Sequence, residues 1–340
     1  MKQIVVDEPL DEIEVHPSGF YERLVEVCLE SANDLLSQSE QFVEMGCPAC
    51  RSIERKHAFD KHGYSYWVCT QCVSLYVSPR PSKVQMQDYI YRSKVTSYRQ
   101  SDEYILTMQR RFSELAARRA EWIASLYASI PQMDQRLVVD IENQLPEYLL
   151  ALKDRGVKPL GVVAHSASKQ ADTQLQVEDL SIWDDICDLE EKSVGLFSAF
   201  NILEHMADPG EFIDSAYQAL EPGGILVMTT RSGSGFDIQV LWEYANVFPL
   251  EHINLISVEG IREMLNSTGF KILEVSTPGR LDVQIVERTL QQQGEKIIPR
   301  FVAYFLKHRD QYAREKLQHF LQENLLSSYM RVVAQKPHEP

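Results

Sequence analysis

The pattern of hydrophobic and polar residues changes character along the first 130 residues of the chain. From Phe20 to about 37, hydrophobic side chains recur at helical spacing, which predicts a helix. Residues 45–80 instead hold short runs rich in Tyr, Val and Trp and a His62-Gly63 turn signal, which predict a small β module. A second helical pattern runs from about 101 to 128. The first third of the chain therefore predicts a β module flanked by helices.

After residue 131 the pattern alternates between short hydrophobic runs and amphipathic segments. Alternating strands and helices are typical of a parallel sheet with right-handed crossovers. Strands are predicted at 137–141, 160–163, 194–200, 225–230, 271–275 and 330–334, with helices at 147–153, 209–220, 258–267 and across about 282–323.

Composition narrows the function classes. The 340 residues include 34 Lys and Arg against 49 Asp and Glu, a formal net charge of −15, and no run of five basic residues. Such a chain repels polyphosphate, which disfavours nucleic-acid binding. No hydrophobic run reaches the roughly 18 residues of a membrane span, and the acidic start does not have the layout of a signal peptide. We therefore expect a cytoplasmic protein.

Four of the six cysteines form two CxxC pairs, Cys47 with Cys50 and Cys69 with Cys72. Two such turns on neighbouring hairpins can direct four thiolates at one tetrahedral metal. Their separation falls in the range of zinc ribbons, so we predict one structural Zn²⁺. The alternative is a redox-active CxxC pair, which the presence of two pairs disfavours.

Several segments carry a family resemblance: YWVCTQC (66–72) with YVSPRP (76–81), NILEHMADP (201–209), LEPGGILV (220–227) and EHINL (251–255). Together they resemble bacterial class I methyltransferases that use S-adenosylmethionine (SAM) and carry an N-terminal zinc ribbon. The resemblance covers roughly residues 45–336 and implies a Rossmann-like sheet, mostly parallel with an antiparallel last strand, preceded by a small β zinc ribbon and helices.

This resemblance, together with the hydrophobic pattern, suggests a division of the chain into four parts. We expect an N-terminal helical segment at 1–44, the zinc ribbon at 45–82 and a helical linker at 83–130. The methyltransferase-like domain would then occupy 131–340, with a helical insertion near 282–323.

The first strand of the sheet departs from the family pattern at the loop that normally contacts SAM. In the family this strand ends in an Asp followed by a loop of the form D-x-G-x-G-x-G. Here Asp140 is present, but Glu142, Gln144 and Pro146 replace the three glycines. Glycine lets the backbone bend sharply and approach the cofactor, and a Cβ at these positions obstructs that approach.

A second departure affects the ribose end of the same site. The family's second strand ends in an acid that accepts hydrogen bonds from the ribose hydroxyls, and here Val163 or Ala164 stands in its place. Asp185, or its neighbour Asp184, remains as a candidate for the adenine end. Each lost hydrogen bond costs roughly 1–3 kcal/mol. The joint loss predicts SAM affinity weakened by about three to four orders of magnitude.

Two histidines are candidates for chemistry on an acceptor. His205 follows the predicted strand at 194–200, and His252 lies on a predicted loop over the pocket mouth. Either side chain could act as a base, if its pKa is near neutrality, or could simply hold the loops in place. Tyr329 and Arg331 share one face of the last strand and could also face the pocket.

Two functions follow from these observations. The resemblance implies methyl transfer from SAM to an unknown small acceptor, for example a sugar or envelope precursor. The altered loop favours the alternative, a catalytically inactive methyltransferase-like scaffold that binds or regulates a protein partner. In both hypotheses Zn²⁺ is structural, and SAM is a cofactor only in the first.

Overall fold

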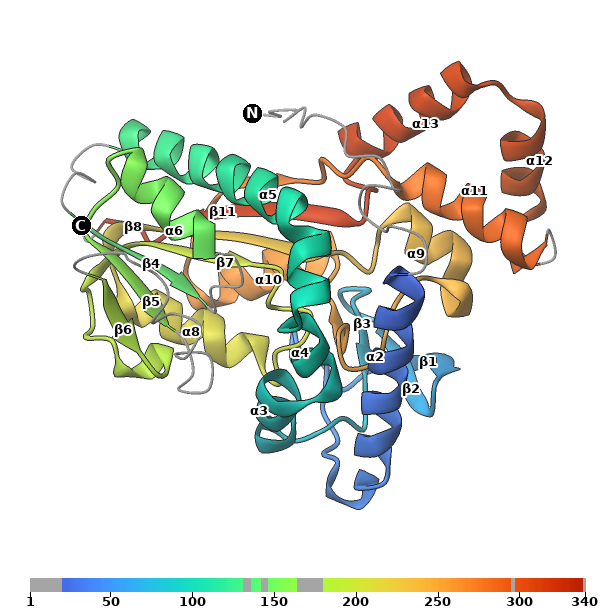
Figure 1. Cartoon of the computed structure of the whole chain (residues 1–340), viewed down its shortest axis with the longest axis horizontal. Coiled ribbons are helices and arrows are strands. Elements are labelled where there is room, and N and C mark those ends of the chain that lie inside the picture. Colours follow the sequence, from blue (N-terminus) through green and yellow to red (C-terminus); the bar gives the residue numbers. More distant parts are fainter. Residues whose placement is uncertain (1–19, 131–135, 142–145, 164–179, 295–296, 339–340) are drawn as a thin grey trace.

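The computed structural model of the chain describes residues 20–130, 136–141, 146–163, 180–294 and 297–338 (Figure 1). The helices are α2 (Phe20–Leu36), α3 (Lys83–Arg92), α4 (Lys94–Arg99), α5 (Asp102–Ser129), α6 (Pro146–Asp154), α8 (Pro209–Ala219), α9 (Phe236–Leu241), α10 (Val258–Thr268), α11 (Asp282–Gln293), α12 (Arg300–His308) and α13 (Gln311–Glu323). The strands are β1 (Arg55–Lys61), β2 (Tyr64–Cys69), β3 (Leu75–Val77), β4 (Leu137–Ile141), β5 (Leu160–Val163), β6 (Ser181–Trp183), β7 (Val194–Phe200), β8 (Leu220–Arg231), β9 (Asn254–Leu255), β10 (Lys271–Ser276) and β11 (Tyr329–Gln335).

The larger sheet has seven strands in the order β10-β11-β8-β7-β4-β5-β6. Strands β8, β7, β4, β5 and β6 pair in parallel, whereas β11 runs antiparallel to both β8 and β10. The predicted fold class, a mostly parallel sheet with an antiparallel last strand, is confirmed. Strand β6 has no counterpart among the predicted strands.

Strand β8 begins earlier than the sequence predicts. The hydrophobic pattern predicts a strand at 225–230, but the strand starts at Leu220 and includes the Pro222-Gly223-Gly224 segment. Gly223 adopts φ +81°, and its amide donates to the carbonyl of Lys336 beyond β11. The segment is therefore an irregularity inside the strand, stabilised by the hydrogen bond to Lys336.

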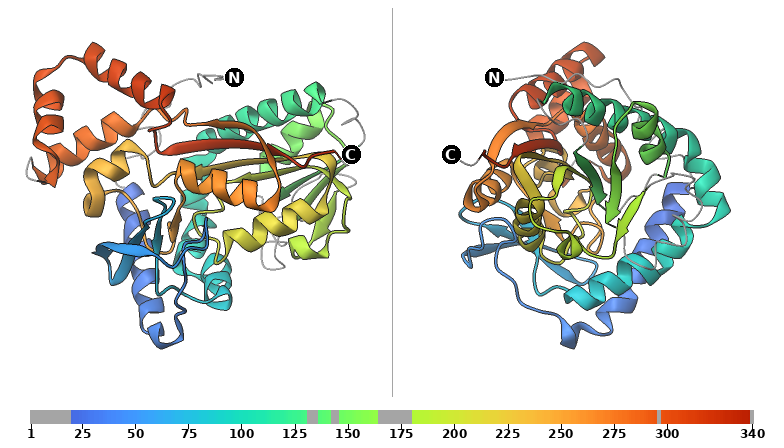
Figure 2. Two further views of the ribbon diagram at one scale, coloured as in Figure 1. Left: turned by 180° about the vertical axis from the view of Figure 1, so that it is seen from behind. Right: turned by 90° about the vertical axis from the view of Figure 1, so that its left-hand side faces the viewer.

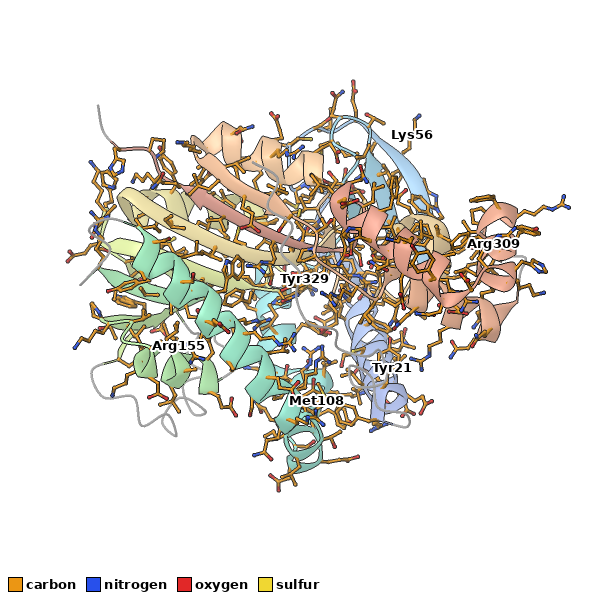
Figure 3. All side chains as sticks on the ribbon, turned by 90° about the horizontal axis from the view of Figure 1, so that it is seen from above. Tyr21, Lys56, Met108, Arg155, Arg309 and Tyr329 are labelled. Atoms are coloured by element: carbon orange, nitrogen blue, oxygen red, sulfur yellow. The ribbon has the colours of Figure 1, made fainter. Side chains whose placement is uncertain are left out.

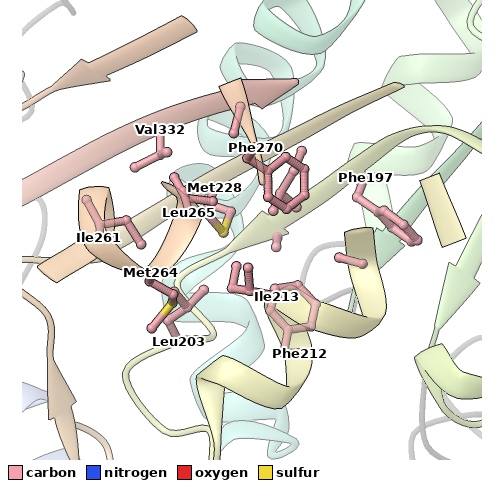
Figure 4. Close-up of a cluster of buried hydrophobic side chains, with 14 of the residues drawn as sticks. Phe197, Leu203, Phe212, Ile213, Met228, Ile261, Met264, Leu265, Phe270 and Val332 are labelled. Carbon is pink, nitrogen blue, oxygen red and sulfur yellow. The ribbon is translucent and has the colours of Figure 1, made fainter. Parts of the chain in front are cut away.

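Helices cover both faces of the large sheet (Figure 2). The long helix α5 and helix α6 pack on one face, where Ile123, Leu149 and Val138 belong to one buried cluster. Helices α8 and α10 pack on the other face, and their side chains interdigitate with Met228 and Phe197 of the strands (Figure 4). This three-layer arrangement buries the central strands β4, β5, β7, β8 and β11 on both sides, which explains their nearly continuous hydrophobic runs, whereas the outer strands β6 and β10 are partly exposed.

The smaller sheet joins the N-terminal part of the chain to the C-terminal part. Strands β1, β2 and β3 form an antiparallel meander, and the short strand β9 adds to its edge. Leu75 pairs with Leu255 and Tyr76 with Asn254. The ribbon therefore shares its sheet with a segment about 180 residues away in sequence.

The predicted helices across 282–323 are present as α11, α12 and α13. Figure 1 shows them projecting from one end of the molecule, away from the sheet. Helix α11 packs through Val283 and Val286 against a cluster that also contains Ile238 of α9. Only one side of this appendage is therefore anchored to the remainder of the protein.

Candidate functional site

The candidate ligand-binding edge of the large sheet is the edge where its parallel strands have their carboxyl ends. Strands β4 and β7 are neighbours in the sheet but lead to opposite sides of it, because β5 and β6 follow β4 whereas β8 follows β7. In open α/β sheets such a reversal opens a crevice at the carboxyl ends, where ligands bind. Strands β4, β5 and β7 end at this edge with Ile141, Val163 and Phe200.

Asp140 lies near this edge but is engaged inside the fold. It is 4% exposed, and its Oδ1 accepts a hydrogen bond of 2.5 Å from Ser198 Oγ on β7. The hydroxyl of Tyr148 on α6 donates to Ser198 Oγ at 3.1 Å, which extends the chain of hydrogen bonds. One carboxylate oxygen is therefore already satisfied by the protein and helps to attach α6 to the sheet.

The other residues predicted for SAM also occupy structural positions where the structure describes them. Val163 is 6% exposed and belongs to the hydrophobic cluster beneath the sheet. Asp185 caps the short helix η2 (Ile186–Asp188), where its Oδ1 accepts from the amide of Cys187 at 3.0 Å. Glu142 and Gln144 lie outside the described residues.

These observations test whether the chain fits SAM. A buried Val163 offers no acceptor for ribose hydroxyls. Asp185 is the carboxylate predicted for the adenine end, and one of its oxygens already accepts a hydrogen bond from the amide of Cys187. The described residues therefore fit SAM poorly.

The loop after β7 carries a buried acid that the sequence did not single out as a site residue. Glu204 is 4% exposed, and its Oε1 accepts from the amide of Arg231 at 2.7 Å. Its Oε2 has no hydrogen-bond partner among the described residues. Burial raises the pKa of Glu204, and the nearby His205 opposes this shift only partly. A buried acid with one free oxygen is a candidate proton acceptor.

His252 is held as a neutral imidazole. The amide of Phe248 donates to His252 Nδ1 at 3.1 Å, which leaves the hydrogen on Nε2. Burial, aided by the positive charge of Arg231, lowers the pKa of His252 to about 3. Near pH 7 this side chain can donate a hydrogen bond through Nε2, but its Nδ1 is not available as a base.

His205 also lies in this region, because its charge acts on Glu204, Glu251 and His252. The two predicted catalytic histidines are thus close enough to interact, and each has an acid beside it in sequence. Their catalytic role remains a proposal.

The loop that carries His252 is fixed from the N-terminal part of the chain. Glu251 receives a hydrogen bond of 2.6 Å from Tyr89 Oη on α3 and an ion pair of 2.5 Å from Arg99 on α4. Burial alone would raise the pKa of Glu251, but Arg99 and Tyr89 outweigh it and lower the pKa to about 2. Tyr66 of the ribbon donates to the carbonyl of His252 at 3.2 Å.

Arg80 is the second link between the ribbon and this site. It is 1% exposed, and its Nη1 donates to Asn254 Oδ1 at 2.7 Å. The Asn254 amide in turn donates to the carbonyls of Leu203 at 2.8 Å and Met206 at 2.7 Å, on the loop after β7. One buried arginine therefore connects the end of the ribbon with the loop that carries Glu204 and His205.

The four paired cysteines converge. The Sγ atoms of Cys47, Cys50, Cys69 and Cys72 all lie within 4.8 Å of one another. The Cys47–Cys72 and Cys50–Cys69 separations are both 3.4 Å, near the roughly 3.8 Å that four ligands at a Zn–S distance of about 2.3 Å would give. These residues therefore fit a tetrahedral metal ion, as the spacing predicts.

Several groups stabilise negative charge on these sulfurs. The amide of Gln71 donates to Cys69 Sγ at 3.4 Å, and the Ser74 hydroxyl lies 3.2 Å from Cys72 Sγ. The pKa of Cys72 falls to about 5, chiefly because the Cys47 thiol donates to it, whereas that hydrogen bond raises the pKa of Cys47 and burial raises the pKa of Cys50 to about 11. A metal ion would replace the remaining thiol protons, because it requires deprotonated thiolates.

The cysteine cluster is part of the main hydrophobic core. Cys47, Cys69 and Cys72 are at most 4% exposed and pack in the same cluster as Ile256 and Val258 at the start of α10. The Ser257 hydroxyl donates to the carbonyl of Cys72. Loss of a metal here would therefore disturb the sheet domain as well as the ribbon.

The comparisons with known proteins agree with this topology. Residues 121–275 match the family model of a methyltransferase domain. The matched segment contains β4 to β10 and covers just under half of the chain. The methyltransferase-like domain so defined includes the loop after β7 and the loop that carries His252. No curated protein matches the chain.

Solved structures match the chain at low sequence identity and with TM-scores below 0.5. A SAM-dependent methyltransferase from Archaeoglobus fulgidus is 12% identical, with a TM-score of 0.45, and the match covers 69% of this chain and all of that one. Phosphoethanolamine N-methyltransferase 2 from Haemonchus contortus, in complex with SAM, is 18% identical with a TM-score of 0.46, over 78% of this chain and 63% of that one.

In the part of the chain that the structure describes, no helix is both long and hydrophobic enough to cross a membrane.

Proposed function

We propose that this chain is a methyltransferase-family protein that has lost ordinary SAM affinity and acts as a ligand-binding or partner-binding scaffold. The observation that carries the proposal is the structural engagement of the predicted SAM residues. Asp140 is bonded to Ser198, Val163 is buried in the core and Asp185 caps its own turn. The glycine replacements at Glu142, Gln144 and Pro146 support the same conclusion.

The ribbon belongs to this proposal as a structural zinc module. Its cysteines would hold one Zn²⁺, and its strands would fix the loops at the ligand-binding edge through Arg80 and Tyr66. We keep the division into 1–44, 45–82, 83–130 and 131–340 as a proposal about chain organisation. A protein partner or a small ligand would contact the edge that these parts build together.

The alternative function is methyl transfer to a small acceptor, and the buried Glu204 favours it. When bound, SAM would supply the methyl group. This chain's own contribution would be to place the acceptor near Glu204 and His205, with the Nε2 hydrogen of His252 available to orient it. A sugar or envelope precursor remains the acceptor class that the resemblance implies.

Thermal unfolding with and without SAM distinguishes the two. A ligand at a thousand times its Kd stabilises the folded state by about 4.1 kcal/mol. At millimolar SAM a micromolar site would give a stabilisation of that order, whereas a millimolar site gives only about 0.4 kcal/mol. We expect no resolvable shift. A large shift, reproduced by S-adenosylhomocysteine, would instead support the enzyme.

A further inference from the structure

Two arginines meet at the ligand-binding edge, on the face of the sheet covered by α5. Arg119 comes from α5 and lies over the ring of Phe200, with its guanidinium carbon 4.6 Å from the ring centroid. Arg331 comes from β11 and lies over the ring of Trp122, 3.6 Å from its centroid. The two rings are themselves 6.1 Å apart, so the two cations share one aromatic platform.

Sheet register places both arginines beside the same polar pair. Arg331 is directly opposite Thr229 in the β11–β8 pairing, so their side chains lie on one face of the sheet. Thr229 Oγ1 donates to Asn201 Oδ1 at 2.9 Å, and Arg119 Nη2 donates to the same oxygen at 3.0 Å. Asn201 follows the last residue of β7, where the crevice opens.

The arginines have more donors than the described protein has acceptors for them. Each guanidinium carries five N–H groups in a rigid fork. Arg331 is 8% exposed, and its buried Nε has no hydrogen-bond partner among the described residues. Arg119 uses one donor on Asn201, and no described carboxylate pairs with either side chain. Leaving a buried charged donor without an acceptor is costly, so a ligand is the natural partner.

We propose that Arg119 and Arg331 form a subsite for an oxyanion, the phosphate or carboxylate group of a small ligand bound at the carboxyl edge of the sheet. The fork of Arg331 matches the planar spacing of two oxygens, and Arg119 adds a second cation. The subsite goes beyond the proposed function, because it needs neither SAM nor methyl transfer. It also gives the scaffold a class of ligand.

Calorimetric titration of the full zinc-loaded chain with inorganic phosphate, and separately with acetate, tests the subsite. We expect saturable binding of at least one anion. Stronger binding of phosphate would assign a phosphorylated ligand, and stronger binding of acetate would assign a carboxylated one. Absence of saturable binding of both anions would overturn the proposal.

Matched variants locate the binding. Arg331→Gln and Arg119→Gln should each weaken it about tenfold or more, because each removes charge-assisted hydrogen bonds. Arg309→Gln is the control, since Arg309 also lies over an aromatic ring, that of Tyr304 at 5.4 Å, but on the exposed appendage (Figure 3). Equal weakening in the control would show that general electrostatics, and not the subsite, binds the anion.

Arg331→Lys guards against misfolding of the glutamine variants. It keeps the positive charge and loses the fork, so its affinity should lie between those of the native chain and Arg331→Gln. Only variants with the native unfolding midpoint are compared. Native affinity in a folded Arg331→Lys together with a folded Arg331→Gln would refute the role of Arg331.

Discussion

Single residues at the candidate site are defined more by their hydrogen bonds than by their type. His252 is an apparent catalytic base in the sequence, yet its Nδ1 is occupied by the amide of Phe248. Glu204 is the reverse case, because the sequence does not mark it as a site residue. In the structure it is buried, and its Oε2 has no hydrogen-bond partner among the described residues. At this edge Glu204 is therefore a better candidate proton acceptor than His252.

The neutral state of His252 predicts a pH dependence of stability. Its pKa is lowered from 6.5 to about 3 in the folded chain. A group with a depressed folded pKa contributes stability that is complete above its unfolded pKa and is lost as pH falls toward its folded pKa. The free energy of unfolding should therefore decline from pH 6.5 toward 3, and the His252→Asn variant should show a shallower decline.

Denaturant unfolding at several pH values measures this difference. Asn at 252 can still accept from the Phe248 amide but does not titrate, which makes it a matched replacement. His308→Asn serves as the control, because His308 lies near the end of α12 on the appendage. If His252→Asn retains the native pH slope, the buried neutral imidazole is not its source.

At the scale of elements, the ribbon and the large sheet act as one unit. The connection relies on a two-residue strand, β9, and on the buried guanidinium of Arg80. Arg80 donates to Asn254, to Val77 O at 2.9 Å and to Ala207 O at 3.2 Å. Removing it leaves several buried acceptors unsatisfied at once.

We expect Arg80→Met to lower the free energy of unfolding by about 3 kcal/mol or more, because each orphaned buried group costs about 1–3 kcal/mol. Urea unfolding checks the value. The exposed Arg155→Met, at the residue directly after α6, provides the control and should stay within about 0.5 kcal/mol of the native chain. A native-like Arg80→Met would show that the ribbon and the sheet are held together by other contacts.

The cysteine cluster predicts a metal-dependent element. Metal analysis should find about one zinc per chain. Cys69→Ser should release it, expose residues 45–80 to proteolysis and, because the sulfurs pack in the main core, lower the unfolding temperature of the whole chain.

The exposed Cys187→Ser is the matched control for this experiment and should keep the metal. Purified folded protein that contains no zinc and presents four freely reactive thiols would exclude the metal site.

For the whole molecule, the sequence was sufficient to predict those features that depend on periodic or regularly spaced residues. Hydrophobic runs predicted the strands of the large sheet except β6, which has three mostly exposed residues, and CxxC spacing predicted the convergence of four sulfurs. Strand β9 has only two residues and no periodicity, so its addition to the ribbon was not predictable. The pairing of Arg331 with Trp122 joins residues 209 positions apart, and only the fold brings them together.

The central claim also concerns the whole molecule: we propose that a methyltransferase fold persists here without ordinary SAM affinity. The defects at the glycine loop and at Val163 act on opposite ends of one ligand, so their costs should roughly add. A shift of the loop could compensate for one of them, but not for both.

Calorimetric titration of the native, zinc-loaded chain with SAM tests this claim most directly. The account predicts a Kd in the millimolar range or no measurable heat, as expected for a loss of about 4–6 kcal/mol from an ordinary micromolar site. A micromolar Kd with one site per chain would contradict it, because the pocket would then bind SAM through contacts other than those predicted, and methyl transfer would become the favoured function.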